Sequence, residues 1–177
     1  MKPTFYDTDC LSCFIVIDDT SILEEQFECI YLPYEVYEEF DRPHIQTLKN
    51  RVDNLIDKGF VKVVKFDTDT EDYLLFMKLS SDYFSDKTIG KGEAAVIVHA
   101  KKNNGIVASN NTKDVMRYVE KYNLERISTG DILVMAFENG IITEKEGNMI
   151  WSKMLKRGRW LVEKDFTSYL EKKINNK

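Results

Sequence analysis

The sequence predicts an α/β protein in which helices cover a parallel sheet. Short apolar segments alternate with segments of helical periodicity over almost the whole chain, which is the pattern of a parallel sheet with crossover helices. Carboxylates stand where a strand ends, at Asp7 and Asp9, and where an otherwise apolar helix begins, at Glu93. Because strand ends and helix starts of an open α/β sheet meet at one crevice, the same pattern predicts a ligand site.

The predicted strands are short, apolar and bounded by turn or helix-start signals. They are expected at residues 4–7, 29–32, 61–64, 106–109 and 126–128, with a further strand at 159–162 between the last two helices. Carboxylates end the first strand, Pro33 ends the second and Gly59 precedes the third. Since the chain shows no internal repeat and no linker, we expect a single domain covering residues 1–177.

The predicted helices carry apolar residues three or four positions apart, and most begin at a capping residue or a proline. They are expected at about residues 9–17, 33–40, 43–58, 71–83, 93–102, 114–122, 132–138, 143–156 and 164–170, with a polar loop at 85–92. Pro33 and Pro43 suit the first turn of a helix, where the N–H that proline lacks is not needed. Residues 18–21 are expected to form a turn and a cap.

The composition predicts a soluble, cytoplasmic domain. Among its 177 residues, 43% are hydrophobic. The chain contains no apolar run of about 18 residues and no signal-peptide pattern. Its net charge of −5 disfavours a broad electropositive nucleic-acid surface but permits a local one. The basic run of Lys153, Lys156, Arg157 and Arg159 is expected to be a solvated helix end, with contact to phosphate as the alternative.

The cysteines and histidines do not form a metal-binding pattern. Cys10 and Cys13 have the spacing of a redox motif but lie among apolar residues, so we expect buried, reduced thiols there and at Cys29. His44 and His99 have no zinc-ligand spacing with the cysteines.

Four acidic residues fall where an α/β crevice would collect them, and each also has a simpler structural explanation. Asp7 or Asp9 suits the N-cap of the following helix, and Glu39 lies among other acidic residues, as on a solvated helix face. Glu93 is favoured in a first helical turn by the helix dipole, by about 0.3–1 kcal/mol. Asp114 follows Asn111 by three residues, as in a capping arrangement. The recurring placement, more than any single residue, favours a shared site.

A crevice of this kind suits Mg²⁺ or Mn²⁺. Crowded carboxylates repel one another unless a cation neutralises them, and hard divalent cations take oxygen ligands. Such ions activate water and stabilise the charge on a phosphodiester during its cleavage, so metal-dependent phosphoryl hydrolysis is the natural enzymatic hypothesis. No glycine-rich phosphate loop is present, which disfavours nucleoside triphosphate hydrolysis.

The motifs in their order resemble those of the PIN-domain family, ribonuclease-fold proteins common among the toxins of toxin–antitoxin pairs. Asp7-Thr8-Asp9 resembles the opening Asp-Thr-Asn motif, and residues 32–40, with Glu39 before a large apolar residue, resemble the second. Residues 92–95 are similar to the Gly-Glu-Ala form of the third motif, and residues 109–115 to the fourth. Further similarity to that subgroup is seen at residues 129–133, 139–142 and 158–161.

The resemblance implies a three-layer α/β/α sandwich and a metal-dependent ribonuclease. By motif, Asp7, Glu93 and Asp114 would hold Mg²⁺ or Mn²⁺, and Glu39 would bind it directly or through water. The supporting ligands or orienting groups would be Asp9, Asn110 and Asn111. It also implies single-stranded or structured RNA as substrate, an antitoxin protein as partner and a homodimer. Thr8 is expected to be a backbone-facing turn residue, and both Trp151 and Trp160 are expected in the core, with an interface as their alternative.

Two departures from the family pattern leave other functions open. Asp9 replaces the usual Asn or Ser and adds a carboxylate, whereas Asn110 and Asn111 stand where many members of the subgroup carry an acidic pair. The second departure supports a fold kept for binding RNA or a protein partner with little or no cleavage. A receiver-like phosphoacceptor domain fits less well, because the acid after the third strand, Asp67, is better explained as a helix cap.

Overall fold

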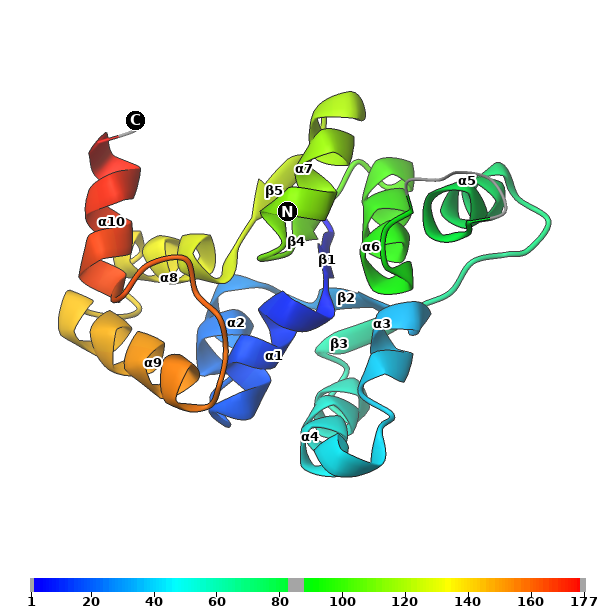
Figure 1. Ribbon diagram of the computed structural model, residues 1–177. Coiled ribbons are helices and arrows are strands. Elements are labelled where there is room, and N and C mark those ends of the chain that lie inside the picture. The colour runs from blue at the N-terminus through cyan, green and yellow to red at the C-terminus, as the bar shows by residue number, and fades with distance from the viewer. Residues whose placement is uncertain (1, 83–87, 176–177) are drawn as a thin grey trace.

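The computed structural model describes residues 2–82 and 88–175, and these form a five-stranded, all-parallel sheet with strand order β3-β2-β1-β4-β5 (Figure 1). The strands are β1 (Thr4–Tyr6), β2 (Ile30–Pro33), β3 (Val61–Val64), β4 (Ile106–Ala108) and β5 (Glu125–Ile127). The predicted α/β class is confirmed, with every one of the first five predicted strands found near its expected position.

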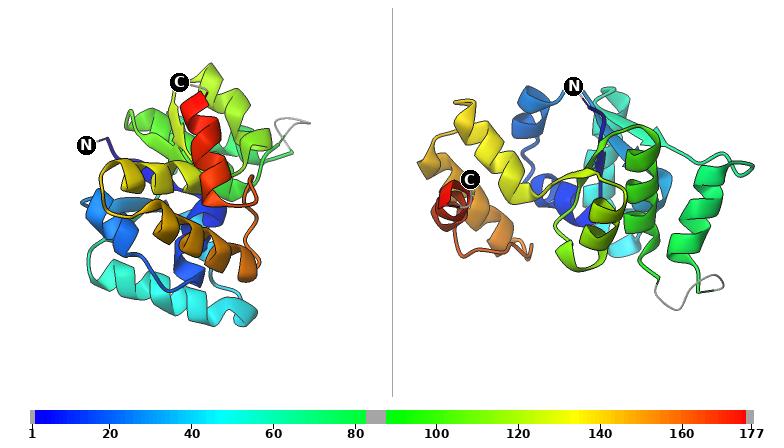
Figure 2. Two further views of the ribbon diagram at one scale, coloured as in Figure 1. Left: turned by 90° about the vertical axis from the view of Figure 1, so that its left-hand side faces the viewer. Right: turned by 90° about the horizontal axis from the view of Figure 1, so that it is seen from above.

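Helices lie on both sides of this sheet (Figures 1 and 2). They are α1 (Thr8–Val16), α2 (Ser21–Gln26), α3 (Tyr34–Glu39), the 3-10 helix η1 (Pro43–Ile45), α4 (Gln46–Asp57), α5 (Glu71–Ser80), α6 (Lys91–Lys102), α7 (Thr112–Lys121), α8 (Thr129–Glu138), α9 (Glu144–Lys156) and α10 (Phe166–Asn175). Side chains of β1 point alternately to opposite faces, yet Thr4, Phe5 and Tyr6 are all buried. Both faces of the central strand are therefore covered, which is the three-layer arrangement.

The topology places a crevice at the carboxyl end of β1. The chain adds β2 and then β3 on one side of β1 and then crosses to β4 on its other side, so the order of winding reverses between β1 and β4. The two strands end level with each other, since Tyr6 pairs with Ala108 and the Asp7 amide donates to the Ala108 carbonyl at 2.9 Å. Such a reversal is where open α/β sheets bind ligands.

The last three helices pack together beside α1 and α2, on the side of the molecule away from α5 (Figures 1 and 2). Trp151 of α9 and Phe166 of α10 are buried between them, and their ring centroids are 6.3 Å apart. The prediction for Trp151 is confirmed. The prediction for Trp160 is wrong, since 70% of that side chain is exposed.

The strand predicted at 159–162 is also wrong. Residues 157–158 form a turn, 159–161 have no regular structure and 162–165 form bends, and the described sheet has no strand from this segment. Gly158, with φ of +75°, turns the chain out of α9, and the Arg159 amide closes the helix on the Met154 carbonyl at 3.0 Å. The segment then follows α9 back, where the Trp151 indole N–H donates to the Glu163 carbonyl. Of its apolar residues, Leu161 is buried while Trp160 and Val162 are exposed, and none of them pairs in a strand ladder.

Smaller differences concern helix bounds and cysteines. Helix α2 was not predicted, because residues 18–21 gave only a turn and cap signal. The predicted helix end at 83 and part of the predicted loop at 85–92 lie outside the described residues. Cys10 and Cys13 are buried free thiols as predicted, and burial raises the pKa of Cys13 to about 11, while Cys29 is half-buried. No helix in the two described ranges has both the length and the apolar character needed to cross a bilayer.

Candidate active site

Asp7 stands at the centre of the crevice. It follows β1 and caps α1, with Oδ1 accepting a hydrogen bond from the Thr8 amide at 2.8 Å and Oδ2 accepting one from the Ser109 hydroxyl at 3.0 Å. The side chain is only 4% exposed. Burial, and then the nearby carboxylates of Asp9 and Glu93, raise the pKa of Asp7 well above its usual value. The capping role and the crevice role therefore coincide in one residue.

Asp9 lies near Asp7, in the first turn of α1. Its Oδ1 accepts a hydrogen bond from the backbone N–H of Asn110 at 3.2 Å, and this bond connects α1 to the segment that follows β4. Burial raises the pKa of Asp9, and Glu93 raises it further. Carboxylates from the β1–α1 junction and from the start of α6 are thus close enough to repel each other.

Glu39 reaches the same crevice from the end of α3. Its Oε2 accepts a hydrogen bond from the Thr8 hydroxyl at 2.6 Å, so the predicted backbone-facing role of Thr8 is wrong. A Cβ at Gly92 would lie 2.6 Å from Glu39 Oε1 and 3.5 Å from Asp7 Oδ1. The missing side chain at Gly92 therefore makes room for Glu39 against α6, a requirement that the sequence motif alone does not explain.

Glu93 is linked to the start of α7 through Asn111. The Asn111 amide nitrogen donates to Glu93 Oε1 at 3.2 Å and to Asp114 Oδ2 at 3.0 Å. Asn111 Oδ1 accepts from the Asp114 amide at 3.2 Å, as the capping explanation predicted. Asp114 is thereby held behind Asn111 and is not among the residues lining the central cavity.

Asn110 uses its side chain to join two elements. Its Oδ1 accepts from the Thr129 amide at 2.9 Å, and its Nδ2 donates to the Thr129 hydroxyl at 2.9 Å. This pair of bonds fastens the end of β4 to the first residue of α8. Asn110 lines the cavity, and its side-chain amide supports the cavity wall.

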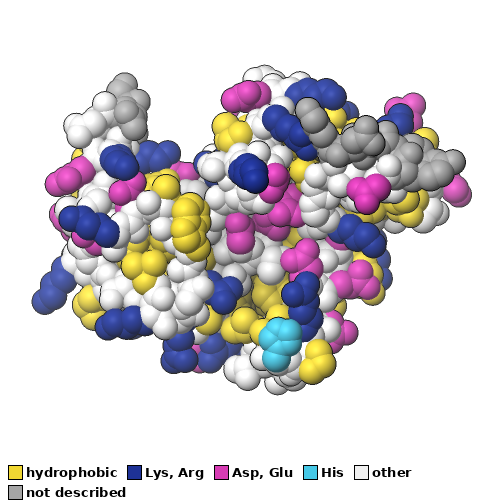
Figure 3. All heavy atoms as spheres, viewed as in Figure 1, with side chains coloured by type: hydrophobic (Ala, Val, Ile, Leu, Met, Phe, Trp, Pro, Cys, Tyr) yellow, Lys and Arg dark blue, Asp and Glu magenta, His cyan; other side chains and the backbone are white. Residues whose placement is uncertain are grey.

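These residues surround a cavity of about 570 Å³. Acidic side chains gather at the centre of this face, in the region of α1, α6 and α7 (Figure 3). Lys113, Arg159 and Trp160 were not predicted to lie at the site, yet all three line the cavity. Arg159 donates to the Ser12 hydroxyl at 3.1 Å, and its buried Nε has no hydrogen-bond partner among the described residues. The basic run around Arg159 was the one signal that pointed to phosphate contact.

The donor set fits a hard divalent cation, although the described residues contain no cluster of three or more His, Cys, Asp or Glu side chains already arranged around a metal position. Asp7, Asp9 and Glu93 offer carboxylate oxygens, which Mg²⁺ and Mn²⁺ prefer. Burial, and then neighbouring carboxylates, raise the pKa values of Asp7 and Asp9, so the charged forms of these side chains are disfavoured and repel one another. A cation is the group that would relieve this repulsion.

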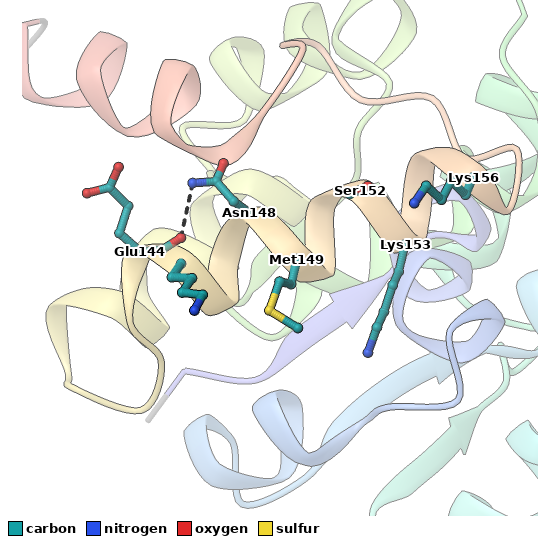
Figure 4. A pocket seen from close by; sticks show the side chains of 7 residues that line it. Glu144, Asn148, Met149, Ser152, Lys153 and Lys156 are labelled. Atoms are coloured by element: carbon teal, nitrogen blue, oxygen red, sulfur yellow. Dashed lines mark hydrogen bonds between the residues drawn. The ribbon is translucent and has the colours of Figure 1, made fainter.

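A wider hollow lies elsewhere, along the outer face of α9 (Figure 4). It has a volume of about 830 Å³, and its side chains, among them Met149, Lys153 and Lys156, project from that single helix. Among the described residues that line it, Glu144 is the only one with a carboxylate. A shallow surface made by one helix brings no groups together from different elements, so the carboxylate crevice is the better candidate for chemistry.

The parallel sheet with carboxylates at its carboxyl edge defines a PIN-like α/β domain. From residue 4 to residue 174 the chain matches the family DUF3368, described as a PIN domain, and it belongs to the PIN-domain family. Its fold is similar to that of a chain in the crystal structure of VapBC2 from Rickettsia felis bound to a DNA fragment from their promoter. The TM-score is 0.51, with 15% identity over 71% of this chain and 97% of the other. At that identity the likeness concerns the fold. No curated protein matches this chain.

Proposed function

We propose that the protein is a Mg²⁺- or Mn²⁺-dependent ribonuclease that hydrolyses phosphodiester bonds in RNA. The observation that carries this proposal is the meeting of Asp7, Asp9, Glu39 and Glu93 around one cavity, where burial, and then its acidic neighbours, raise the pKa of Asp7. Carboxylates brought together from three parts of the chain, at a cost in electrostatic repulsion, are expected where function requires a bound cation.

The acidic side chains of the crevice have different roles in this hypothesis. Asp7 and Glu93 hold the cation, Asp9 and Glu39 contribute directly or through water, and Asp114 acts through Asn111. The bound ion would supply an activated water and neutralise charge on the phosphate. Ser109 and the Thr8 amide fix the orientation of Asp7, so that its oxygens are already placed when substrate arrives.

Cations of the protein itself lie beside the acidic group. Lys113 and Arg159 line the same cavity, where they would attract the phosphate that the carboxylates repel. The Arg159 guanidinium also offers a buried Nε donor that no described residue uses. A local basic pair of this kind is compatible with RNA as substrate despite the net charge of −5.

The first experiment is a calorimetric titration of Mn²⁺ into the wild type and Asp7→Asn, together with cleavage of a mixed RNA pool by both and by Glu93→Gln. We expect metal binding and cleavage in the wild type only. Glu39→Gln is compared with Glu38→Gln as a matched control, since Glu38 is the exposed neighbour on the same helix. Cleavage that survives both Asp7→Asn and Glu93→Gln would show that the metal-nuclease hypothesis is wrong.

A second candidate function is binding of RNA or a protein partner without cleavage. It is favoured by Asn110 and Asn111, whose amides are occupied in holding Thr129, Glu93 and Asp114 and bring no negative charge. Absence of Mn²⁺ binding at millimolar concentration in the wild type would support this candidate. For either function, the toxins that the motifs resemble suggest an antitoxin protein as partner and a homodimer as the assembly. Co-expression with the gene next to this one, followed by co-purification, tests the partner.

A further inference from the structure

A smaller cavity of about 200 Å³ adjoins the carboxylate crevice. The two cavities share Asn110, Thr112 and Trp160 in their walls, so Trp160 stands between them. Apolar atoms from Leu161, Val162 and the rings of Trp151 and Tyr169 line the smaller one, together with the polar side chains of Arg126 and Ser128.

Trp160 is held out into solvent at this point although it is a large apolar side chain. Its neighbour Leu161 is buried, and its other neighbour, Arg159, is tied inward to Ser12. The chain is thus anchored on both sides of a ring that is 70% exposed. An exposed tryptophan beside a cavity is informative, because burying its surface would otherwise stabilise the fold.

The chemistry around Trp160 fits a nucleobase. One face of the site offers an aromatic ring for stacking, which is how proteins hold single-stranded bases without a duplex. Cationic side chains stand on both sides of that ring, Arg159 and Lys113 in the carboxylate crevice and Arg126 in the smaller cavity. The volume is below the roughly 300 Å³ at which pockets for drug-sized ligands begin, and suits a single base.

We propose that the smaller cavity is a base pocket, in which a nucleobase of a single-stranded RNA stacks on Trp160 while the adjoining phosphate lies in the carboxylate crevice. This inference rests on the proposed function for the identity of the strand. It assigns Trp160 to substrate binding, with the Arg126 and Ser128 side chains at the edge of the base.

The test compares RNA tetranucleotides of each base with a tetramer of abasic ribose phosphates. Binding is measured by fluorescence anisotropy in EDTA, which prevents metal-dependent cleavage. The comparison removes the contribution of the phosphates, because both ligands carry the same backbone. We expect the wild type to bind at least one tetranucleotide about tenfold or more tightly than the abasic tetramer.

Variants at Trp160 decide whether that preference comes from the proposed stack. Trp160→Leu should bring the tetranucleotide affinity down to that of the abasic tetramer, whereas Trp160→Phe should keep most of the difference. Met149→Ala, which alters another exposed apolar side chain, on α9, should bind as the wild type does. Equal affinity for both ligands in the wild type, or a preference that persists in Trp160→Leu, would overturn the base pocket.

The remaining outcomes separate this inference from the nuclease hypothesis. A base preference that Trp160→Leu removes, in a protein that neither binds Mn²⁺ nor cleaves RNA, would support the base pocket and refute the nuclease. Metal-dependent cleavage without any base preference would support the nuclease hypothesis and refute the base pocket. If Trp160→Leu changes only the oligomeric state in gel filtration, the ring belongs to a protein interface and the base pocket is wrong.

Discussion

His99 should make the folded state sensitive to acid. It lies in α6 with only 4% of its surface exposed, and its ring stacks on Phe66 at 4.1 Å and on Phe5 at 5.8 Å between centroids. Its Nε2 has no hydrogen-bond partner among the described residues. Burial, and to a lesser extent the charge of Lys102, lower its pKa from 6.5 to about 4. The folded protein therefore keeps a neutral imidazole well below neutral pH.

The direction of the change in stability with pH follows from proton binding in the folded and unfolded states. Between pH 6.5 and about 4 the unfolded chain takes up a proton at His99 that the folded chain does not. The free energy of unfolding is therefore highest above pH 6.5 and falls as the pH is lowered through this window. At about 1.4 kcal/mol for each pH unit, the contribution of His99 to the loss is about 3 kcal/mol in all.

His99→Phe tests this without removing the ring stack. Urea unfolding of the wild type and the variant, followed by circular dichroism between pH 7 and pH 4, gives the free energy of unfolding of each. Acidic residues titrate alike in both proteins, so the difference between the two curves isolates His99. We expect the variant to gain about 3 kcal/mol relative to the wild type over this range.

His44→Phe is the matched control, since His44 is exposed and is the second of the two histidines of the chain. It should leave the pH dependence of the wild type unchanged. Parallel pH curves for the wild type and His99→Phe would refute the reasoning, because they would mean that His99 titrates normally in the fold.

Three substitutions test the site and its surroundings. Because ionised Asp7 is destabilised by burial and by its acidic neighbours, its contribution to stability falls as the pH rises above the usual carboxyl range. Asp7→Asn should therefore raise the free energy of unfolding in EDTA and abolish any rise in melting temperature with Mn²⁺. A lower free energy of unfolding in EDTA would show that the capping interaction of Asp7 outweighs the repulsion from its neighbours. Gly92→Ala should alter stability by less than about 1 kcal/mol, since alanine favours the helix, but it should weaken Mn²⁺ binding in calorimetry by displacing the Glu39 carboxylate. Gly147→Ala should lower the free energy of unfolding by about 1–3 kcal/mol in urea titrations, because its Cβ would lie 2.3 Å from the fully buried ring of Phe166, and equal stability would contradict that packing.

The sequence was sufficient for the sheet and for the place of the crevice. Short, mainly apolar segments such as Val61–Val64 indicate a strand from their local sequence alone. The carboxylates after β1 and at the start of α6 meet because the carboxyl ends of parallel strands lie at one edge of the sheet. Residues 159–162 misled the prediction because a short apolar segment has the same pattern whether it pairs with a strand or, as here, buries Leu161 and leaves Trp160 and Val162 exposed. Only the absence of a neighbouring strand distinguishes the two.

The site was predicted in outline, but the roles of its residues depend on contacts far apart in the sequence. Nothing in the local sequence shows that Asn110 would be engaged by Thr129, or that Trp160 would remain exposed beside the crevice. Asp114 was placed among the metal ligands by its motif. The structure shows the local capping interaction that the sequence also allowed, and it places Asn111 between Asp114 and the cavity.

The amide at Asn111 has a physical consequence for the free protein. It donates to Glu93 and to Asp114, so it is attractive toward two carboxylates at once. A carboxylate at this position would turn both hydrogen bonds into repulsions, next to Asp7 and Asp9, whose pKa values are already raised by burial and then by neighbouring carboxylates. The amide therefore stabilises the crevice without a cation and lowers the charge that would attract one. A site of this composition should bind Mn²⁺ more weakly than one with an aspartate at position 111, and Asn111→Asp should shift that balance toward metal binding at the expense of stability in EDTA.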